Sequence, residues 1–315
     1  MAIDRLEEQR VWKDLHPKIR RGAMAVMNDV TFKDGKATHN RTGEDVTHMV
    51  DVGIKTTHKQ VQALKAVDEL SALEIENGGF IFAFFKQART LEERFPSLTK
   101  QDTARLMYIG TYVAWETNRL QSDNGKQVYT KKDLEQLVDM STKRFNEFFK
   151  RLESENIVHK NTETGEIFIN PTVFYRGELK KHAYDIADLQ YTRLFKKTVQ
   201  DLYKQFKGRT LGQLAVIYSI MPFINFSTNI VSFNPEETAY DLIKPMNLDK
   251  LAVLLDYKDS NKLKQALNRI KVKNQPVFGF FEDTRDRRKK RIVVNPRIIF
   301  AGNGEQLKAI MALFN

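Results

Sequence analysis

An internal repeat constrains the fold of this chain more than any other feature of its sequence. The segment IFINPTVFY at 167–175 recurs as IVVNPRIIF at 292–300, so that each copy carries Asn-Pro followed by apolar residues. Such self-similarity indicates one supersecondary unit used twice. Upstream, Leu134, Leu137, Val138 and Asp139 match Leu251, Leu254, Leu255 and Asp256. With one inserted residue, Phe145, Phe149, Arg151 and Leu152 then match Leu263, Leu267, Arg269 and Ile270.

The first copy predicts two short helices followed by a β-hairpin. Thr130 is a good N-cap for KKDLEQLVDM, and Ser141 starts a second helix, STKRFNEFFKRLESEN, after a tight turn. Strand-like residues at 157–160 and 167–170 flank a turn at Glu163–Gly165. This order is typical of a winged helix-turn-helix. The opening helix is expected to start at Thr99 with Asp102 three residues on.

We therefore expect a mainly α fold with small β wings, an α+β class, built from tandem winged helix-turn-helix domains. Apolar spacing predicts helices over 59–76 and 80–95 and a long helical linker between the domains, which could also mediate dimerisation. A hairpin over 28–43, with Asp34-Gly35 at its turn, belongs to an N-terminal arm. The expected division is arm 1–77, first domain 78–178, linker 179–208 and second domain 209–315.

The second helix of each pair is the candidate DNA-recognition helix. Its apolar residues point inward and leave polar and cationic residues on the other face, where Asn and Gln suit adenine and Arg and Lys suit guanine. A solvated amphipathic helix is the plainer interpretation. The candidates in the first copy are Thr142, Lys143, Arg144, Asn146 and Lys150. Those in the second copy are Asn261, Lys262, Lys264, Gln265 and Asn268.

A dense basic cluster is expected at the tip of the second wing, where it could reach a phosphate backbone or a minor groove. The alternative is a solubilising turn. The cluster comprises Arg285, Arg287, Arg288, Lys289, Lys290 and Arg291. The first wing tip carries two glutamates and no cation, so the first domain is expected to rely on its helix and on Arg176, Lys180 and Lys181.

Composition narrows the classes of function. The chain has 51 Lys and Arg against 40 Asp and Glu, a net charge of +11 that attracts polyanions. It has no cysteine, its six histidines lack metal-site spacing, and it contains no nucleotide-loop or nucleophile-elbow motif. We expect no cofactor, no bound metal and no catalytic residue. No run of residues is apolar enough to span a membrane, so a cytoplasmic protein is expected.

The segment from Leu98 to Leu179, ending INPTVFYRGEL, resembles the winged-helix replication proteins (RepL type) of plasmids and phages of low-GC Gram-positive bacteria. It is more distantly similar to MarR-type regulators. The resemblance weakens in the second half, where Phe300-Ala-Gly302 stands in place of Phe174-Tyr-Arg-Gly177. It implies binding to an origin or operator through Thr142, Lys143, Arg144 and Asn146.

The sequence thus predicts sequence-specific binding of double-stranded DNA, by a phage or plasmid replication initiator at origin repeats. A transcriptional regulator that binds an operator would have the same sequence features. A protein-interaction module of a replication complex is the alternative from another class. Whether the chain forms a homodimer or contacts replication proteins stays open.

Overall fold

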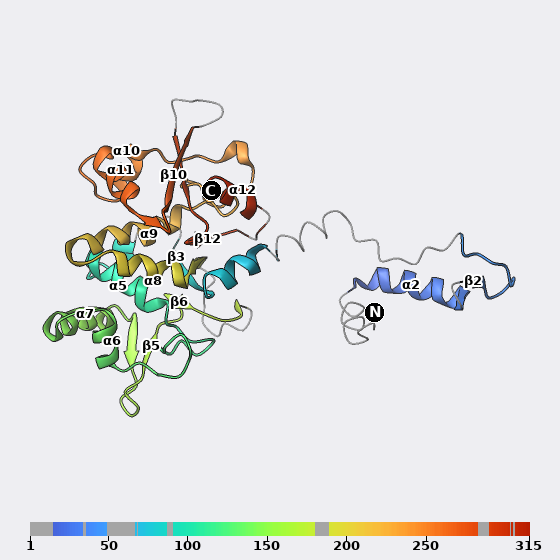
Figure 1. Cartoon of the computed structure of the whole chain (residues 1–315), viewed down its shortest axis with the longest axis horizontal. Coiled ribbons are helices and arrows are strands. Elements are labelled where there is room, and N and C mark those ends of the chain that lie inside the picture. The colour runs from blue at the N-terminus through green and yellow to red at the C-terminus, as the bar shows by residue number, and fades with distance from the viewer. Residues whose placement is uncertain are drawn as a thin grey trace. The chain divides into compact units, whose positions relative to one another are not determined.

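A computed structural model describes residues 15–33, 36–48, 67, 69–86, 91–179, 189–282, 290–302, 304 and 306–315 of the chain (Figure 1). The chain divides into two units, Met1–Val61 and Gln62–Asn315, and each is described by itself. Among the described residues, no helix combines the length and apolar character needed to cross a membrane.

The N-terminal unit contains a helix and a hairpin. α2 (Pro17–Asp29) begins with a proline, which suits the first helical position, and leads directly into β1 (Val30–Lys33). β1 pairs antiparallel with β2 (Lys36–His39). The hairpin expected over 28–43 is confirmed, although its turn, 34–35, lies outside the described residues. α2 was not predicted, because PKIRRGAMAVMND has few large apolar side chains to mark a buried face.

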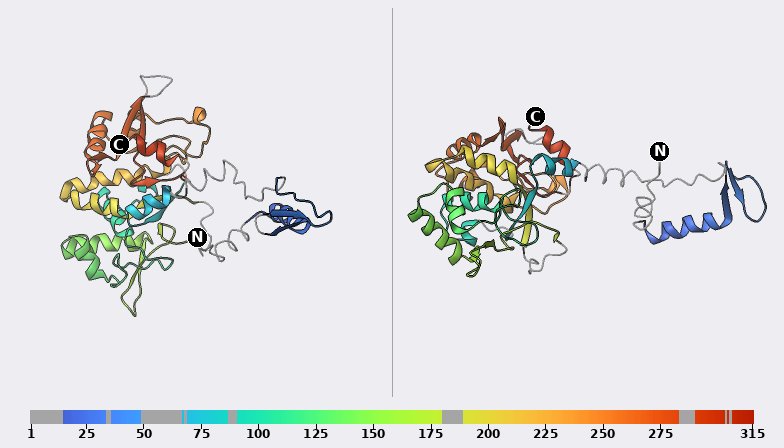
Figure 2. Two further views of the ribbon diagram at one scale, coloured as in Figure 1. Left: turned by 45° about the vertical axis from the view of Figure 1, so that its right-hand side comes forward. Right: turned by 60° about the horizontal axis from the view of Figure 1, so that its bottom comes forward.

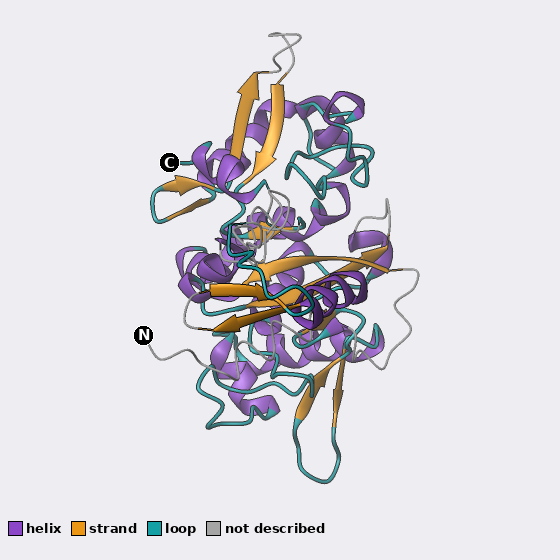
Figure 3. Cartoon of the chain, turned by 90° about the vertical axis from the view of Figure 1, so that its right-hand side faces the viewer, coloured by secondary structure: helices purple, strands orange, loops and turns teal. Residues whose placement is uncertain are grey.

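A four-stranded antiparallel sheet lies at the centre of the larger unit (Figure 3). Its strand order is β12 (Ile299–Phe300), β7 (Leu189–Phe195), β3 (Phe80–Lys86) and β6 (Phe174–Tyr175). β3 and β7 pair along their full lengths. Because β6 follows the first Asn-Pro and β12 follows the second, the sheet contains strands from both copies of the repeat.

Helices and small hairpins surround this sheet (Figure 2). The helices are a helix over 69–76, α4 (Leu91–Arg94), α5 (Lys100–Gly110), α6 (Lys131–Leu137), α7 (Thr142–Ser154), α8 (Lys196–Gln205), α9 (Ala215–Ser219), α10 (Leu248–Leu254), α11 (Ser260–Arg269) and α12 (Leu307–Ala312). The 3₁₀ turns are η2 (Gly208–Leu214), η3 (Met221–Phe223) and η4 (Tyr240–Leu242). The hairpins pair β4 (Val158–Lys160) with β5 (Ile167–Ile169), β8 (Lys271–Val272) with β9 (Gln275–Pro276), and β10 (Phe278–Glu282) with β11 (Lys290–Val294).

Equivalent hydrogen bonds appear in both copies of the repeat. Asn118 has φ 56° and donates from Nδ2 to the carbonyl oxygens of Ile169 at 3.0 Å and Phe174 at 2.7 Å. Asn229 has φ 54° and does the same to Val294 at 3.1 Å and Ile299 at 2.7 Å. Asparagine suits both positions because it tolerates the left-handed conformation. The repeat therefore extends from sequence to backbone geometry.

The expected fold class is wrong in its architecture. The structure is a mix of about 41% helix and 22% strand rather than mainly α. Its two copies share one hydrophobic core instead of forming separate domains on a helical linker. Residues from both copies, including Phe145, Leu263 and Ile299, belong to one hydrophobic core together with Leu194 from the segment between them. The linker expected over 179–208 contains β7 before α8 begins.

The helix expected over 80–95 is also wrong, because its first part is the buried strand β3. The apolar run FIFAFF does not distinguish a strand from a buried helix by periodicity alone, and the apolar residues of the mixed segment LQYTRLF also fit the helical spacing expected over 179–208. Their aromatic residues suit a strand that neighbours cover on both faces. Once β3 and β7 are paired, the two copies pack against a common sheet instead of forming two independent cores.

Candidate nucleic-acid interface

The first candidate surface is built by α6 and α7. Thr130 and Asp133 form a capping box at the start of α6, and Asp139 turns the chain with φ 53° before α7 begins. Hydrogen bonds from Thr130 hold the pKa of Asp133 below its ordinary value, as expected of a capping carboxylate. Each end of α6 is therefore fixed by local interactions, which set the position from which α7 starts.

α7 is strongly amphipathic. Phe145, Phe148, Phe149 and Leu152 are buried, as their spacing predicts. The five candidate residues of this helix, Thr142, Lys143, Arg144, Asn146 and Lys150, are all exposed. The hydroxyl of Thr142 donates to Glu135 Oε1 at 2.6 Å, which connects α7 to α6 on the solvent side.

α10 and α11 repeat this arrangement in the second copy. Asn247 caps α10 through its side chain, Asp256 turns the chain with φ 54°, and Asp259 caps α11. The sequence of α11, SNKLKQALNR, contains three cations and no carboxylate. Asn261, Lys262, Gln265 and Asn268 are exposed, whereas Lys264 is half-buried.

Both helices lie toward one side of the larger unit, with α5, α8 and α9 between them (Figure 1). The hairpins β4–β5 and β10–β11 lie at opposite ends of the unit (Figure 3). In the first hairpin the ring of His159 stacks on Phe168 with centroids 5.0 Å apart, and Lys160 is exposed. The surface is therefore one array of two cationic helices flanked by two hairpins.

The basic cluster expected on the second hairpin is only partly described. Arg285, Arg287, Arg288 and Lys289 lie outside the described residues, in the segment that joins β10 to β11. Lys290 is exposed and pairs across the hairpin with Glu282. Arg291 is buried, with its guanidinium 4.7 Å from the ring centroid of Tyr240. Arg291 therefore packs inside the second copy, in contrast to its exposed neighbour Lys290.

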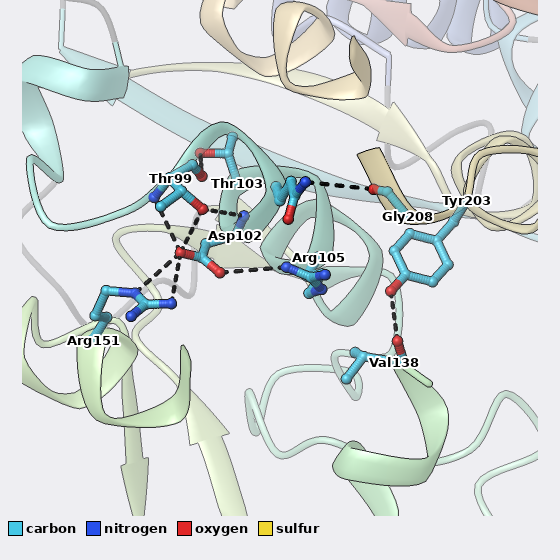
Figure 4. A network of polar contacts seen from close by, with 9 residues as sticks. Thr99, Asp102, Thr103, Arg105, Val138, Arg151, Tyr203 and Gly208 are labelled. Atoms are coloured by element: carbon cyan, nitrogen blue, oxygen red, sulfur yellow. Dashed lines mark hydrogen bonds and ion pairs between the residues drawn. The ribbon is translucent and has the colours of Figure 1, made fainter. Parts of the chain in front are cut away.

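Arg151 shows what reasoning from helical spacing missed. The spacing places it near the solvent face of α7, but its Nε and Nη2 each lie 3.0 Å from Oδ2 of Asp102 (Figure 4). Asp102 is buried at the start of α5, where it also completes the capping box of Thr99. This ion pair fixes α7 against α5. The capping box predicts Asp102 as a helix-capping residue, but nothing in the sequence indicates that Asp102 also forms an ion pair with Arg151.

No family model, curated protein or solved structure matches this chain. Within the described residues, no three His, Asp or Glu side chains are grouped so that they could hold a metal ion. The candidate surface is therefore assessed from its own geometry and charge.

Proposed function

We propose that the larger unit binds double-stranded DNA through α7 and α11, with the hairpins contacting the flanking backbone. The observation that carries this proposal is that equivalent helices of the repeat, which lie toward one side of the larger unit, both expose cationic and amide side chains. Lysine and arginine neutralise phosphates, and asparagine and glutamine pair with base edges in the major groove. The excess of positive charge favours the same partner.

The proposed biological role is initiation of replication at origin repeats. It rests on the resemblance of 98–179 to RepL-type proteins. Action at an operator is the second candidate, because two reading helices on one chain suit either kind of site. We expect a bipartite site, since each helix reads its own short stretch of base pairs.

Footprinting of the full chain across its own gene and flanking DNA, at about 150 mM salt so that nonspecific attraction is suppressed, tests this proposal. Protection of iterated sequences supports the initiator, and protection over a promoter supports the regulator. The absence of any discrete footprint, combined with capture of a replication protein, would favour the protein-interaction alternative.

Charge and specificity variants separate the roles of the side chains. Lys150→Ala should weaken binding to all sequences and reduce the slope of log affinity against log salt by about 0.9 if one phosphate contact is lost. Lys308→Ala removes the same charge from an exposed position of α12, outside the proposed surface, and is the matched control. Arg144→Ala or Asn146→Ala should instead reduce the preference for the specific site over other sequences, by about 1–3 kcal/mol of binding free energy. Unchanged site preference in both variants would show that α7 is not a reading helix.

A further inference from the structure

A cavity of about 250 Å³ lies behind the first candidate surface. Its walls come from α5, from the end of α6 and the turn before α7, from the end of α8, and from η2. Arg105, Lys204 and Lys207 bring three cations to this cavity, and Asp139 brings one carboxylate. The cavity is therefore positively charged, although none of these residues belongs to the exposed faces proposed to read DNA.

One wall of the cavity is aromatic. The rings of Tyr108 and Tyr203 stack with centroids 3.9 Å apart and planes 1° apart. Tyr203 donates its hydroxyl to the carbonyl oxygen of Val138 at 3.0 Å, in the turn before α7 (Figure 4). Burial raises the pKa of Tyr203 to about 12, so this hydroxyl stays protonated at neutral pH. Phe206 adds apolar surface beside the tyrosines.

The guanidinium of Arg105 is incompletely hydrogen-bonded. Its only ion pair among the described residues is a long contact of 3.5 Å from Nη1 to Oδ1 of Asp102, whose other oxygen binds Arg151 and Thr99 (Figure 4). Nε of Arg105 is buried and has no hydrogen-bond partner in the described part of the chain. Because Arg105 lines the cavity and 13% of its side chain is exposed, an anionic group there would lie beside an incompletely paired guanidinium.

The equivalent place in the second copy is closed. There the turn after α10 borders a space of about 10 Å³. Lys100 fills the region, with Nζ 3.2 Å from the carbonyl oxygen of Leu255 and 5.4 Å from the ring centroid of Tyr257. Leu255 is the repeat counterpart of Val138, so a lysine takes the place that the Tyr203 hydroxyl has in the first copy. The open cavity is therefore a property of the first copy and not a consequence of the repeated fold.

We propose that this cavity binds a small organic anion that combines a phosphate or carboxylate with a planar apolar group. The anionic group contacts Arg105, Lys204 and Lys207, and the planar group lies against Tyr203 and Phe206. Cations with an apolar, aromatic wall are the combination that such a ligand requires. This site does not depend on DNA binding, so each proposal can fail without the other.

Calorimetric titration of the full chain with phenyl phosphate tests the site. We expect saturable binding of one equivalent, and binding at least about tenfold weaker for benzyl alcohol, which keeps the ring and lacks the charge. The double variant Lys204→Ser/Lys207→Ser should weaken phenyl phosphate binding by at least about tenfold. Both lysines are exposed, so these substitutions leave the core intact.

Lys197→Ser is the matched control, because Lys197 is an exposed lysine of α8, the helix that contains Lys204, and does not line the cavity. It should bind phenyl phosphate as the unmodified chain does. No saturation below about 10 mM, equal affinity for benzyl alcohol, or an equal loss in Lys197→Ser would each overturn the proposal. Inorganic phosphate binding as tightly as phenyl phosphate would overturn the planar part of it.

Discussion

Substitution of Asn229 by alanine should destabilise both copies of the repeat, so that they unfold together at lower urea concentration. Asn229 is fully buried, adopts a left-handed backbone, and its Nδ2 satisfies the carbonyl oxygens of Val294 and Ile299. Loss of two hydrogen bonds costs about 1 kcal/mol each, and an alanine in the left-handed region costs about 1–2 kcal/mol more. We expect a total loss of about 3–4 kcal/mol in the free energy of unfolding.

The assay reads the effect in the other copy. Trp115 lies in the first copy with 53% of its surface exposed, and a Trp12→Phe background leaves it as the only tryptophan of the chain. If both copies share one core, Asn229→Ala should shift the urea midpoint of Trp115 fluorescence by about 1 M or more, together with the midpoint of circular dichroism. Asn268→Ala, at an exposed position of α11, is the control and should leave both midpoints nearly unchanged.

An unchanged Trp115 midpoint in Asn229→Ala, with a biphasic transition in circular dichroism, would refute the shared core. The second copy would then unfold on its own, as expected of separate domains. Asn229→Gly distinguishes the two parts of the cost, because glycine keeps the left-handed backbone and loses only the side-chain hydrogen bonds. It should therefore be less destabilising than alanine.

Three further substitutions test other parts of the larger unit. Asp102→Asn removes the charge that Arg151 binds at 3.0 Å and should lower the unfolding free energy by about 1–3 kcal/mol in urea; an unchanged midpoint would mean that the pair is fully screened. Gly110→Ala would place a Cβ 2.5 Å from the ring of Phe174 and should lower the melting temperature through overpacking that costs about 1–3 kcal/mol. The control is Gly22→Ala in α2, where the new Cβ meets no atom within 4 Å and the backbone φ is not positive. Burial raises the pKa of Tyr218 to about 12, so its contribution to stability is complete below pH 10.0, the ordinary pKa, and is lost as the pH rises toward 12. Tyr218→Phe should reduce that loss of unfolding free energy at alkaline pH. It should leave the unfolding free energy at pH 7 equal or higher, because the buried hydroxyl has no hydrogen-bond partner among the described residues. An identical alkaline loss in the variant would show that Tyr218 is not the group that titrates.

Local signals in the sequence predicted the starts of α5 and α6 and the buried face of α7. The capping boxes of Thr99 with Asp102 and of Thr130 with Asp133 are both present, and the buried stripe of α7 follows its spacing. These features depend on residues a few positions apart, so the sequence contains nearly all the information that determines them. The exposed faces of α7 and α11 were predicted for the same reason, apart from the half-buried Arg151 and Lys264.

Contacts between distant segments were not predictable from the same patterns. The pairing of β3 with β7 joins segments far apart in the chain, and neither strand alternates clearly enough to be distinguished from a helix. The contact of Arg151 with Asp102 and the cavity at Arg105 likewise depend on how α5, α7 and α8 pack. Repetition in the sequence predicted equivalent local structures, but it did not reveal that they share one core.

The order of strands in the central sheet has a consequence for synthesis on the ribosome. β3 is made early, yet its partner β7 ends at Phe195 and β12 ends at Phe300. At synthesis rates of about 5–20 residues per second, the apolar segment FIFAFFK waits roughly 5–20 s for β7. An unpaired apolar strand readily joins another chain. A nascent chain that stalls between these strands is therefore an expected client of chaperones, and fragments that end before 189 are expected to aggregate.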